Sequence, residues 1–404
     1  MKTLITYCTI VLSLTSNVLC GCSTGNDKTV DSAIAESYCL DDYTTSSPSD
    51  IFSDIEVIPL LWGAEGYYPS VATDLSVSDS IVFVRDKDEI LHVFDAEGKY
   101  LACSKNRMGY GPGEYSIFMG FIPEKQNRIE ILTPDRMISY DTRLNYLGQR
   151  ELKTKIGEEG RIYDRGIGLG NGYYLLQPTM HSMRPHSVTY YDMANNIALH
   201  EIDYAEDVVF PFITQTKCFF RMPDGDYLFC PPAFTRYIYR VDPSGNKLSR
   251  YISMTYGGQY VNEDDVKGIS EDMDAISRYY FNGSKPIPSQ RMINSSMIFT
   301  MIRNGRMLKD NYLLVIDRTT GECHRIDLHN DRGYQLGMLW DIDEKYAYAI
   351  NRKDFVVTNP DVLLGHSENF TNILSTLEDD DYVLIKYQLN KPTLPKCITA
   401  NQPQ

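Results

Sequence analysis

One stretch of the chain brings together side chains that could hold a sugar or a peptide. It is the run 106–115, in which three glycines stand around Pro112. The candidate ligand-binding residues in or beside it are Arg107, Tyr110, Glu114 and Tyr115. An arginine and a carboxylate can hydrogen-bond to hydroxyl groups, while a tyrosine ring can stack on a sugar face. The commoner use of such a run is a structural corner, in which Glu114 accepts backbone N–H groups.

Two other polar turns carry candidate ligand-binding residues. Arg184 lies between His181 and His186, and Asp331 and Arg332 follow Asn330. The two histidines are too few for a metal centre, because no Asp, Glu or Cys lies in their loop. We therefore predict no metal site and no cofactor. A polar hairpin tip and a surface ion pair are the alternatives for these two turns.

The sequence carries none of the common local motifs of catalysis. A Gly-x-Ser-x-Gly elbow, a phosphate-binding P-loop and a His-Glu-x-x-His helix are all absent. Carboxylates are plentiful, but the separation that a glycosidase pair needs is a distance in space. We expect a binding or scaffold protein more than an enzyme. A lyase or hydrolase acting on polysaccharide or peptide is the alternative.

Short β-strands in repeated units must position these residues. The units are predicted to span about 40–50 residues, and each holds up to four strands. The expected strands are 81–84, 90–94 and 99–103 in unit one (70–103), 118–122, 128–133, 137–141 and 146–152 in unit two, 166–169, 172–177, 187–192 and 197–202 in unit three, 217–222, 226–231, 237–242 and 247–252 in unit four, 296–303, 312–317 and 322–328 in unit five, and 336–341, 346–351 and 355–358 in unit six. A turn running from Asp to Gly recurs at 95–99, 242–246 and 317–322, between the third and fourth strands of a unit.

Helical sequence interrupts this pattern twice. Near 261–280, Asn262 can cap a helix whose first turn is acidic, and apolar residues follow at helical spacing. Pro286 and Pro288 are expected to end this insertion. A second short helix is predicted near 368–377, before a final strand at 382–389.

Six such units predict an all-β fold, a six-bladed β-propeller with four-stranded antiparallel blades, over residues 54–390. A single strand, 55–61, precedes the first unit, and strand 382–389 ends the last one. We expect these two strands to close the ring, because an open ring would leave blade edges unpaired. Glu56 and Leu384 should then lie in neighbouring strands. Connectors between blades are expected at the mouth of the central channel, where ligands bind.

The first residues form a targeting signal and not part of the fold. The apolar stretch 4–19 is too short and interrupted for a membrane span, and it ends at Leu19-Cys20-Gly21-Cys22. This ending resembles a bacterial lipobox, which implies a signal peptide over 1–21, lipidation of Cys22 and an outer-membrane lipoprotein facing either the periplasm or the cell surface. An ordinary secretory signal is the alternative. Residues 22–53 are expected to form an acylated, partly disordered tether, and 391–404 a C-terminal tail.

Composition restricts the partners further. The formal charge is −15 and no basic stripe exists, so nucleic acid and anionic lipid surfaces are poor partners. The 30 tyrosines could serve glycan binding, although strand packing is the commoner use. Six cysteines follow Cys22, and none has CxxC or zinc spacing. We expect most of them to be buried free thiols, with Cys218 and Cys230 flanking one hairpin turn.

The whole pattern resembles one known group, the six-bladed β-propeller lipoproteins of Bacteroides-type bacteria, which are distantly similar to NHL-repeat propellers. The residues that carry the resemblance are 58–60, 93–99, 109–115, 316–321, 330–331 and 378–389. The resemblance implies a cell-envelope protein anchored to the membrane. It would bind a glycan, a peptide or a partner protein. NHL-type lyases use metal-binding histidines, and no such set can be matched to this sequence.

Overall fold

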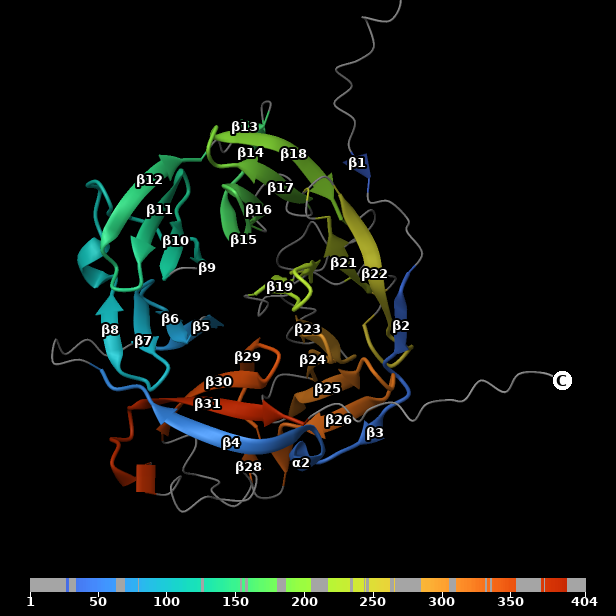
Figure 1. The fold of residues 1–404 in the computed structure, drawn as a ribbon. Coiled ribbons are helices and arrows are strands. Elements are labelled where there is room, and N and C mark those ends of the chain that lie inside the picture. Colours follow the sequence, from blue (N-terminus) through green and yellow to red (C-terminus); the bar gives the residue numbers. More distant parts are fainter. Residues whose placement is uncertain are drawn as a thin grey trace, which may run out of the picture.

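Six four-stranded antiparallel sheets follow one another around a central axis, as Figure 1 shows. The computed structural model describes residues 27–28 and 34–390, except 63–69, 79, 125–126, 153–154, 157–158, 180–186, 205–216, 233–234, 243, 245–246, 262–264, 266–284, 305–309, 331–332, 335, 354–371 and 374. The predicted six-bladed β-propeller is confirmed.

Each blade runs from an innermost to an outermost strand. The blades are β5 (Ala72–Ser78), β6 (Ile81–Asp86), β7 (Leu91–Asp95) and β8 (Tyr100–Cys103); β9 (Gly120–Glu124), β10 (Arg128–Leu132), β11 (Arg136–Asp141) and β12 (Tyr146–Glu151); β15 (Tyr163–Gly170), β16 (Tyr173–Pro178), β17 (Ser187–Asp192) and β18 (Ile197–Asp203); β19 (Phe219–Arg221), β20 (Tyr227–Phe229), β21 (Tyr237–Val241) and β22 (Leu248–Thr255); β23 (Ile287–Ile293), β24 (Met297–Arg303), β25 (Tyr312–Asp317) and β26 (Cys323–Asp327); and β29 (Leu339–Ile342), β30 (Tyr346–Arg352), β31 (Tyr382–Leu389) and β4 (Phe52–Pro59). Two small hairpins, β13–β14 (Lys155–Ile156, Glu159–Gly160) and β27–β28 (His329–Asn330, Gly333–Tyr334), lie beside them.

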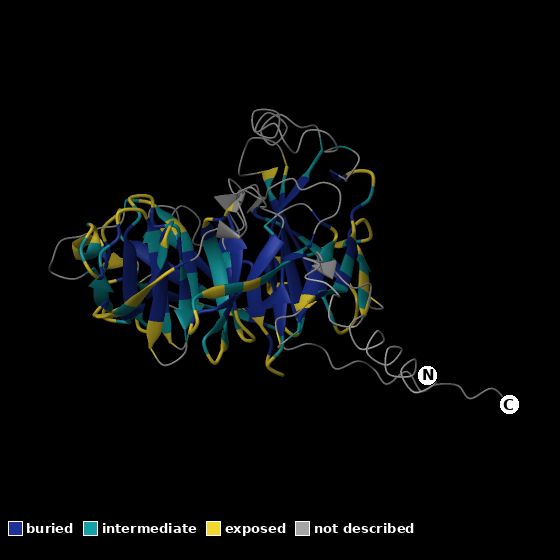
Figure 2. Ribbon diagram, turned by 90° about the horizontal axis from the view of Figure 1, so that it is seen from above, coloured by how far each residue is buried: buried dark blue, intermediate teal, exposed yellow. Residues whose placement is uncertain are grey.

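The core lies between the blades. Every residue of β17 is buried, and so is nearly all of β24, because both faces of these strands pack against other strands. Outermost strands such as β12 are largely exposed. Figure 2, which views the ring from its edge, shows buried strands through the middle of the disc and exposed turns along its two faces. This arrangement explains why apolar residues occur on both sides of the middle strands.

The two ends of the propeller close the ring in one sheet. β4 pairs antiparallel with β31, with Ile58 opposite Leu384 and Glu56 opposite Lys386. The closing strands predicted from the sequence are thus confirmed. Ile58 and Leu384 are both buried in the cluster that joins blades six and one. Closure removes the free edges that an open ring would expose.

The segment before β4 runs along the outside of the ring. β1 (Asp27–Lys28), β2 (Glu36–Cys39) and β3 (Thr44–Thr45) pair in parallel with β18, β22 and β26, so the N-terminal chain follows blades three, four and five in turn (Figure 1). A short helix, α2 (Pro48–Ile51), leads into β4. We call residues 34–51 the strap.

The sequence predicted an acylated, partly disordered tether over 22–53, and within that range the strap is ordered against the ring. Its backbone fills the open edge of the blades, for example where the Leu40 amide donates to the Thr255 carbonyl at 3.0 Å. Leu40 is fully buried, and Arg318 and Glu36 form an ion pair at 2.5 Å. Such short strands need few large apolar residues, so composition alone did not reveal them. Of 22–33, only 27–28 are described.

Blade five differs from the prediction in one strand. Pro286 and Pro288 were expected to end an insertion, yet β23 contains Pro288 and forms the innermost strand. An innermost strand has a hydrogen-bonded neighbour on one side only, and a bulge between Pro288 and Gln290 absorbs the missing N–H. Most of the helix predicted at 261–280, half of the helix predicted at 368–377 and the whole strand predicted at 355–358 lie outside the described residues. The signal peptide (1–21), Cys22 and the tail (391–404) also lie outside them.

The cysteines that the structure describes are free thiols: Cys39, Cys103, Cys218, Cys230 and Cys323. Cys218 and Cys230 face each other across the β19–β20 hairpin, where the Cys230 amide donates to the Cys218 carbonyl at 2.8 Å. Both are buried, and burial raises the pKa of each thiol, that of Cys230 to about 12. They are therefore expected to stay protonated and unreactive.

Candidate functional site

The glycine run lies at the outer part of blades one and two. It follows a 3-10 turn, η1 (Lys105–Arg107), and packs on the outer strands, where the Tyr140 hydroxyl donates to the Gly113 carbonyl at 2.8 Å. Among the described residues, the channel pocket defined below includes none of this run. The expectation that it reaches the channel mouth is not met.

The predicted binding residues of this run have structural contacts. Glu114 accepts the Gly111 amide at 2.9 Å, and Arg107 donates to the Leu144 carbonyl at 3.0 Å. Tyr115 is buried, and its hydroxyl contacts Ser104 at 2.5 Å. Tyr110 is 88% exposed. This geometry fits the structural corner. Arg184, His181, His186, Asp331 and Arg332 lie outside the described residues, so their roles stay predictions.

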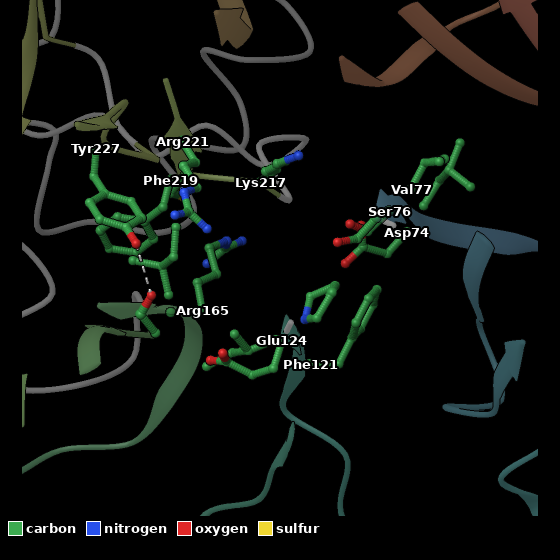
Figure 3. A pocket seen from close by; sticks show the side chains of 18 of the residues that line it. Asp74, Ser76, Val77, Phe121, Glu124, Arg165, Lys217, Phe219, Arg221 and Tyr227 are labelled. Atoms are coloured by element: carbon green, nitrogen blue, oxygen red, sulfur yellow. Dashed lines mark hydrogen bonds between the residues drawn. The ribbon is translucent and has the colours of Figure 1, made fainter. Parts of the chain in front are cut away.

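A cavity of about 260 Å³ occupies the centre of the ring, and we call it the channel pocket. The innermost strands of four blades supply its wall: β5, β9, β15 and β19 with its preceding residues. Figure 3 shows its polar and aromatic side chains converging from opposite sides: Asp74, Ser76, Phe121, Glu124, Arg165, Lys217, Phe219, Arg221 and Tyr227. Ligands of closed propellers are bound at such convergent inner strands.

Glycines let the inner strands of blades two and three approach closely. A Cβ on Gly120 would lie 1.9 Å from the Asp164 carbonyl oxygen. A Cβ on Gly168 would lie 2.0 Å from Oε1 of Glu124. Gly168 thereby leaves room for the Glu124 carboxyl group against β15, so this glycine is part of how the pocket is built.

Two cations of the pocket are engaged by carboxylates. Arg165 contacts its neighbour Asp164 at 2.7 Å. Lys217 reaches the buried Asp341 of β29 at 2.5 Å. Asp341 also accepts the Val77 amide at 2.8 Å, so it ties blades four, six and one together. These ion pairs brace the channel and leave little cationic charge for a ligand.

Arg221 is different. Its side chain is exposed on the pocket side, with the guanidinium carbon 5.8 Å from the centre of the Tyr227 ring. Within the part of the chain that the structure describes, it makes no ion pair and no side-chain hydrogen bond. The Tyr227 hydroxyl donates to the Gly168 carbonyl at 3.4 Å, which orients the ring (Figure 3). Arg221 is therefore ready to bind an anionic group.

Glu124 faces the same space. Its Oε1 atom is buried without a hydrogen-bond partner in the described structure. Burial raises the pKa of Glu124 to about 7, and the negative charge of Glu130 acts in the same direction. Arg128 and the Tyr174 hydroxyl act against this rise. Burial likewise raises the pKa of Asp164, whose Oδ1 is buried without a partner among the described residues. Displaced carboxyl pKa values in a cavity are typical of functional sites.

The sequence did not single out Glu124, Arg165, Lys217 or Arg221, because each is an isolated charge in a short strand. One signal was present in the sequence. Charged residues recur in the first strand of several units, at Asp74, Glu124, Arg165 and Arg221, where a propeller strand faces the channel. Spacing along the chain cannot show that these positions converge.

The described residues hold neither a metal-ligand cluster nor a membrane-spanning helix. Within these ranges, no three His, Cys, Asp or Glu side chains are grouped to hold a metal ion. No helix in the described part is both long and apolar enough to cross a membrane.

Fold and site together define a closed six-bladed propeller with a charged, aromatic pocket at its axis. Residues 28–344 match the family described as 6-bladed beta-propeller, and the chain belongs to this family. No curated protein matches the sequence.

Several solved structures resemble the chain. A Bacteroides fragilis protein whose name describes it as exported is 14% identical, with a TM-score of 0.64 over 88% of this chain and 99% of that chain. A Bacteroides caccae protein of unknown function is 11% identical, with a TM-score of 0.38 over 61% of this chain and 78% of that one. The extracellular domain of a Bacteroides thetaiotaomicron hybrid two component system is 10% identical, with a TM-score of 0.35 over 67% of this chain and 29% of that one. At such identities the first likeness concerns the fold alone.

Proposed function

We propose that the protein is an extracytoplasmic lipoprotein whose channel pocket binds a small polar ligand, such as a segment of a glycan or a peptide. One observation carries the proposal. Four blades direct cations, carboxyl groups and aromatic rings into one cavity at the axis of a closed ring. Pockets of this size take a small molecule or one segment of a longer chain.

The membrane anchor rests on the lipobox-like ending at Cys22. The Bacteroides fragilis protein of similar fold carries a name that describes it as exported, which supports the same compartment. β1 already pairs with blade three at Asp27, so the ring would stand close to the bilayer. Acyl chains on the cysteine would hold it there.

A labelling experiment tests the anchor. Cells that express the full chain are fed radioactive palmitate, and the Cys22→Ser variant is compared with the Cys20→Ser variant as control. We expect label on the wild type and on Cys20→Ser, and none on Cys22→Ser. Label that persists on Cys22→Ser would overturn the assignment.

An array experiment tests the binding function. The mature chain from Ser23 retains every described residue, and it is applied to printed glycans and peptides. We expect binding that the channel variant Phe219→Ala weakens. The control is Tyr110→Ala, which removes an exposed aromatic ring that does not line the channel pocket. Binding that both variants retain in full would show that the ligand lies elsewhere.

One observation favours an enzyme as the second candidate. A carboxyl group with a pKa of about 7, as in Glu124, is suited to act as a general acid or base near neutral pH. Incubating the protein with the ligand identified on the array and measuring new reducing ends or unsaturated products tests this candidate. Product formed equally by wild type and Glu124→Gln would exclude Glu124 as the catalytic group.

A further inference from the structure

We propose that the ligand of the channel pocket is an acidic saccharide, with the carboxylate of a uronic acid bound by Arg221 beside Glu124. This inference rests on the proposed binding function and specifies its ligand class. It follows from the charge balance of the pocket, from the state of Glu124 and from the aromatic and acceptor groups around them.

Among the described residues of the pocket wall, the ion pairs leave one cation, Arg221, for a ligand. Arg165 is held by Asp164 at 2.7 Å and Lys217 by Asp341 at 2.5 Å. Arg221 lines the pocket and makes no such close ion pair among the described residues, and the carboxyl group whose pKa its charge lowers, Glu124, still has a raised pKa. A guanidinium group binds a carboxylate through two parallel, charge-assisted N–H···O bonds. A neutral sugar has no carboxylate and cannot form this contact.

When Glu124 is protonated, it carries no charge and does not neutralise Arg221. A neutral carboxyl group can donate a hydrogen bond to the ligand carboxylate, whereas its ionised form would repel it. The charged or titratable groups that face Glu124 come from three neighbouring strands: Glu130 and Arg128 on β10, Tyr174 on β16 and Arg221 on β19. Arg165 on β15 and Tyr227 on β20 share its pocket. Oε1 of Glu124 is buried against Gly168 without a hydrogen-bond partner in the described structure, while the residue as a whole lines the pocket.

The remaining wall fits a sugar ring better than a peptide. The Tyr227 ring is held by its hydrogen bond to Gly168, and the Phe219 ring is stacked on Phe229 with centroids 4.9 Å apart. Fixed aromatic faces of this kind stack on sugar rings at low entropic cost. Asp164 also lines the pocket, and its buried Oδ1 lacks a hydrogen-bond partner within the described structure. Hydroxyl groups both donate and accept, so neighbouring hydroxyls satisfy cations and carboxyl groups together.

Calorimetric titration of the mature chain from Ser23 tests the ligand class. The probes are trisaccharides of galacturonate, glucuronate, mannuronate and guluronate. Each is paired with the trisaccharide of the corresponding neutral hexose, which has a hydroxymethyl group in place of the C6 carboxylate. We expect at least one uronate to bind at least tenfold more tightly than its neutral counterpart. Arg221→Gln should remove this preference. Lys247→Gln, which deletes an exposed cation of the same blade, should leave it unchanged.

A pH series tests the place of Glu124. Between pH 5.5 and 8.5 the uronate stays ionised, so affinity for the wild type should fall as the pH rises through about 7. Glu124→Gln keeps a neutral donor at every pH, and its affinity should be nearly constant over this range. Thermal melts of each variant confirm that the fold is intact. Affinity that falls equally in Glu124→Gln would overturn this role.

The outcomes separate the inference from the proposed function. Preference for a neutral saccharide or for acidic peptides would overturn the uronate and leave channel binding in place. A uronate that binds Arg221→Gln as tightly as wild type would also overturn it. If no saccharide and no peptide bound, both the proposed binding function of the channel pocket and the uronate ligand would be overturned.

Discussion

Lys386 of β31 lies directly opposite Glu56 of β4, and their ammonium and carboxylate groups are 2.5 Å apart. These residues come from opposite ends of the propeller, so their pairing marks the seam where the ring closes. Around them the seam is apolar. Ile58 and Leu384 are buried on it, and the N-terminal chain before β4 pairs with blades three, four and five through β1, β2 and β3.

The seam should be stabilised by its apolar contacts much more than by its ion pair. Leu384→Ala is expected to lower the free energy of unfolding by about 2–4 kcal/mol, because it empties a fully packed position. Lys386→Gln should cost about 0–1 kcal/mol, since the side chain of Glu56 is 55% exposed. Urea denaturation measures both. Equal losses in the two variants would contradict this ranking.

The glycine run should depend on Gly113 more than on its other glycines. Gly113 has a φ of 72°, and a Cβ there would lie 2.6 Å from the ring of Tyr146. Gly113→Ala is therefore expected to cost about 1–3 kcal/mol. A Cβ on Gly111 would instead meet the carboxyl group of Glu114 at 3.1 Å, which can move.

Gly148→Ala is the matched control for Gly113→Ala. It lies in the adjoining strand β12, and a Cβ there would meet nothing within 4 Å. Its effect on the melting temperature should be small. If Gly113→Ala and Gly148→Ala had the same melting temperature, the turn would be able to accommodate a Cβ at position 113, contrary to this prediction.

Much of the architecture could be predicted because local chemistry repeats. In the turn after β7, Oδ1 of Asp95 accepts the Lys99 amide at 2.8 Å, and Gly98 has a φ of 80°. The same Asp-to-Gly pattern at Asp317 and Gly321 identified another blade. The equivalent turns after β11 and β17 have no glycine at the left-handed position, so the Asp-to-Gly pattern did not predict them. Leu144 and Asn196 hold their left-handed positions, with φ values of 56° and 55°.

What the sequence could not predict depends on neighbours distant in the chain. The strap is ordered by the open edge of β22, which its own composition does not record. β23 tolerates Pro288 because of its place beside the channel. The pocket is a further case, since Glu124 and Arg221 meet only once blades two and four have taken their positions. The glycine run stood out in the sequence because its glycines and Pro112 form a structural corner, and this role does not require ligand binding.

Glu124 should make stability fall as the pH rises. Its pKa is raised from 4.5 to about 7 in the folded state, so the folded protein holds a proton that the unfolded chain has lost. The stability that this proton contributes is complete below pH 4.5 and is lost as the pH rises through about 7. Glu124→Gln should therefore equal wild type near pH 4 and exceed it by about 1–3 kcal/mol at pH 8.

Urea denaturation at pH 4, 6 and 8 measures this difference. Glu97→Gln, at an exposed turn, is the control and should follow the wild type throughout. A constant offset between Glu124→Gln and wild type at all three pH values would contradict the raised pKa.

Asp86 should have the opposite pH dependence. It is buried beside His92 in blade one, with Oδ2 3.1 Å from Nε2, while Oδ1 accepts the Ile90 amide at 3.0 Å. Burial acts to raise the pKa of Asp86, but the hydrogen bonds from His92 and Ile90 outweigh it and hold the pKa below its usual 3.8. The ionised form therefore stabilises the fold above that pH, and its contribution is lost as the pH falls through the lower folded value.

Asp86→Asn should thus cost about 1–3 kcal/mol at pH 7, because a neutral amide oxygen accepts these buried hydrogen bonds less strongly than a carboxylate does. The gap between variant and wild type should narrow below about pH 4, when the wild-type carboxylate is also neutralised. Asp88→Asn, exposed in the same turn, serves as control. Denaturation curves between pH 7 and 2.5 measure the gap. A gap that stays constant to the lowest pH would mean that the charge of Asp86 contributes nothing, and that Asp86→Asn acts only through packing.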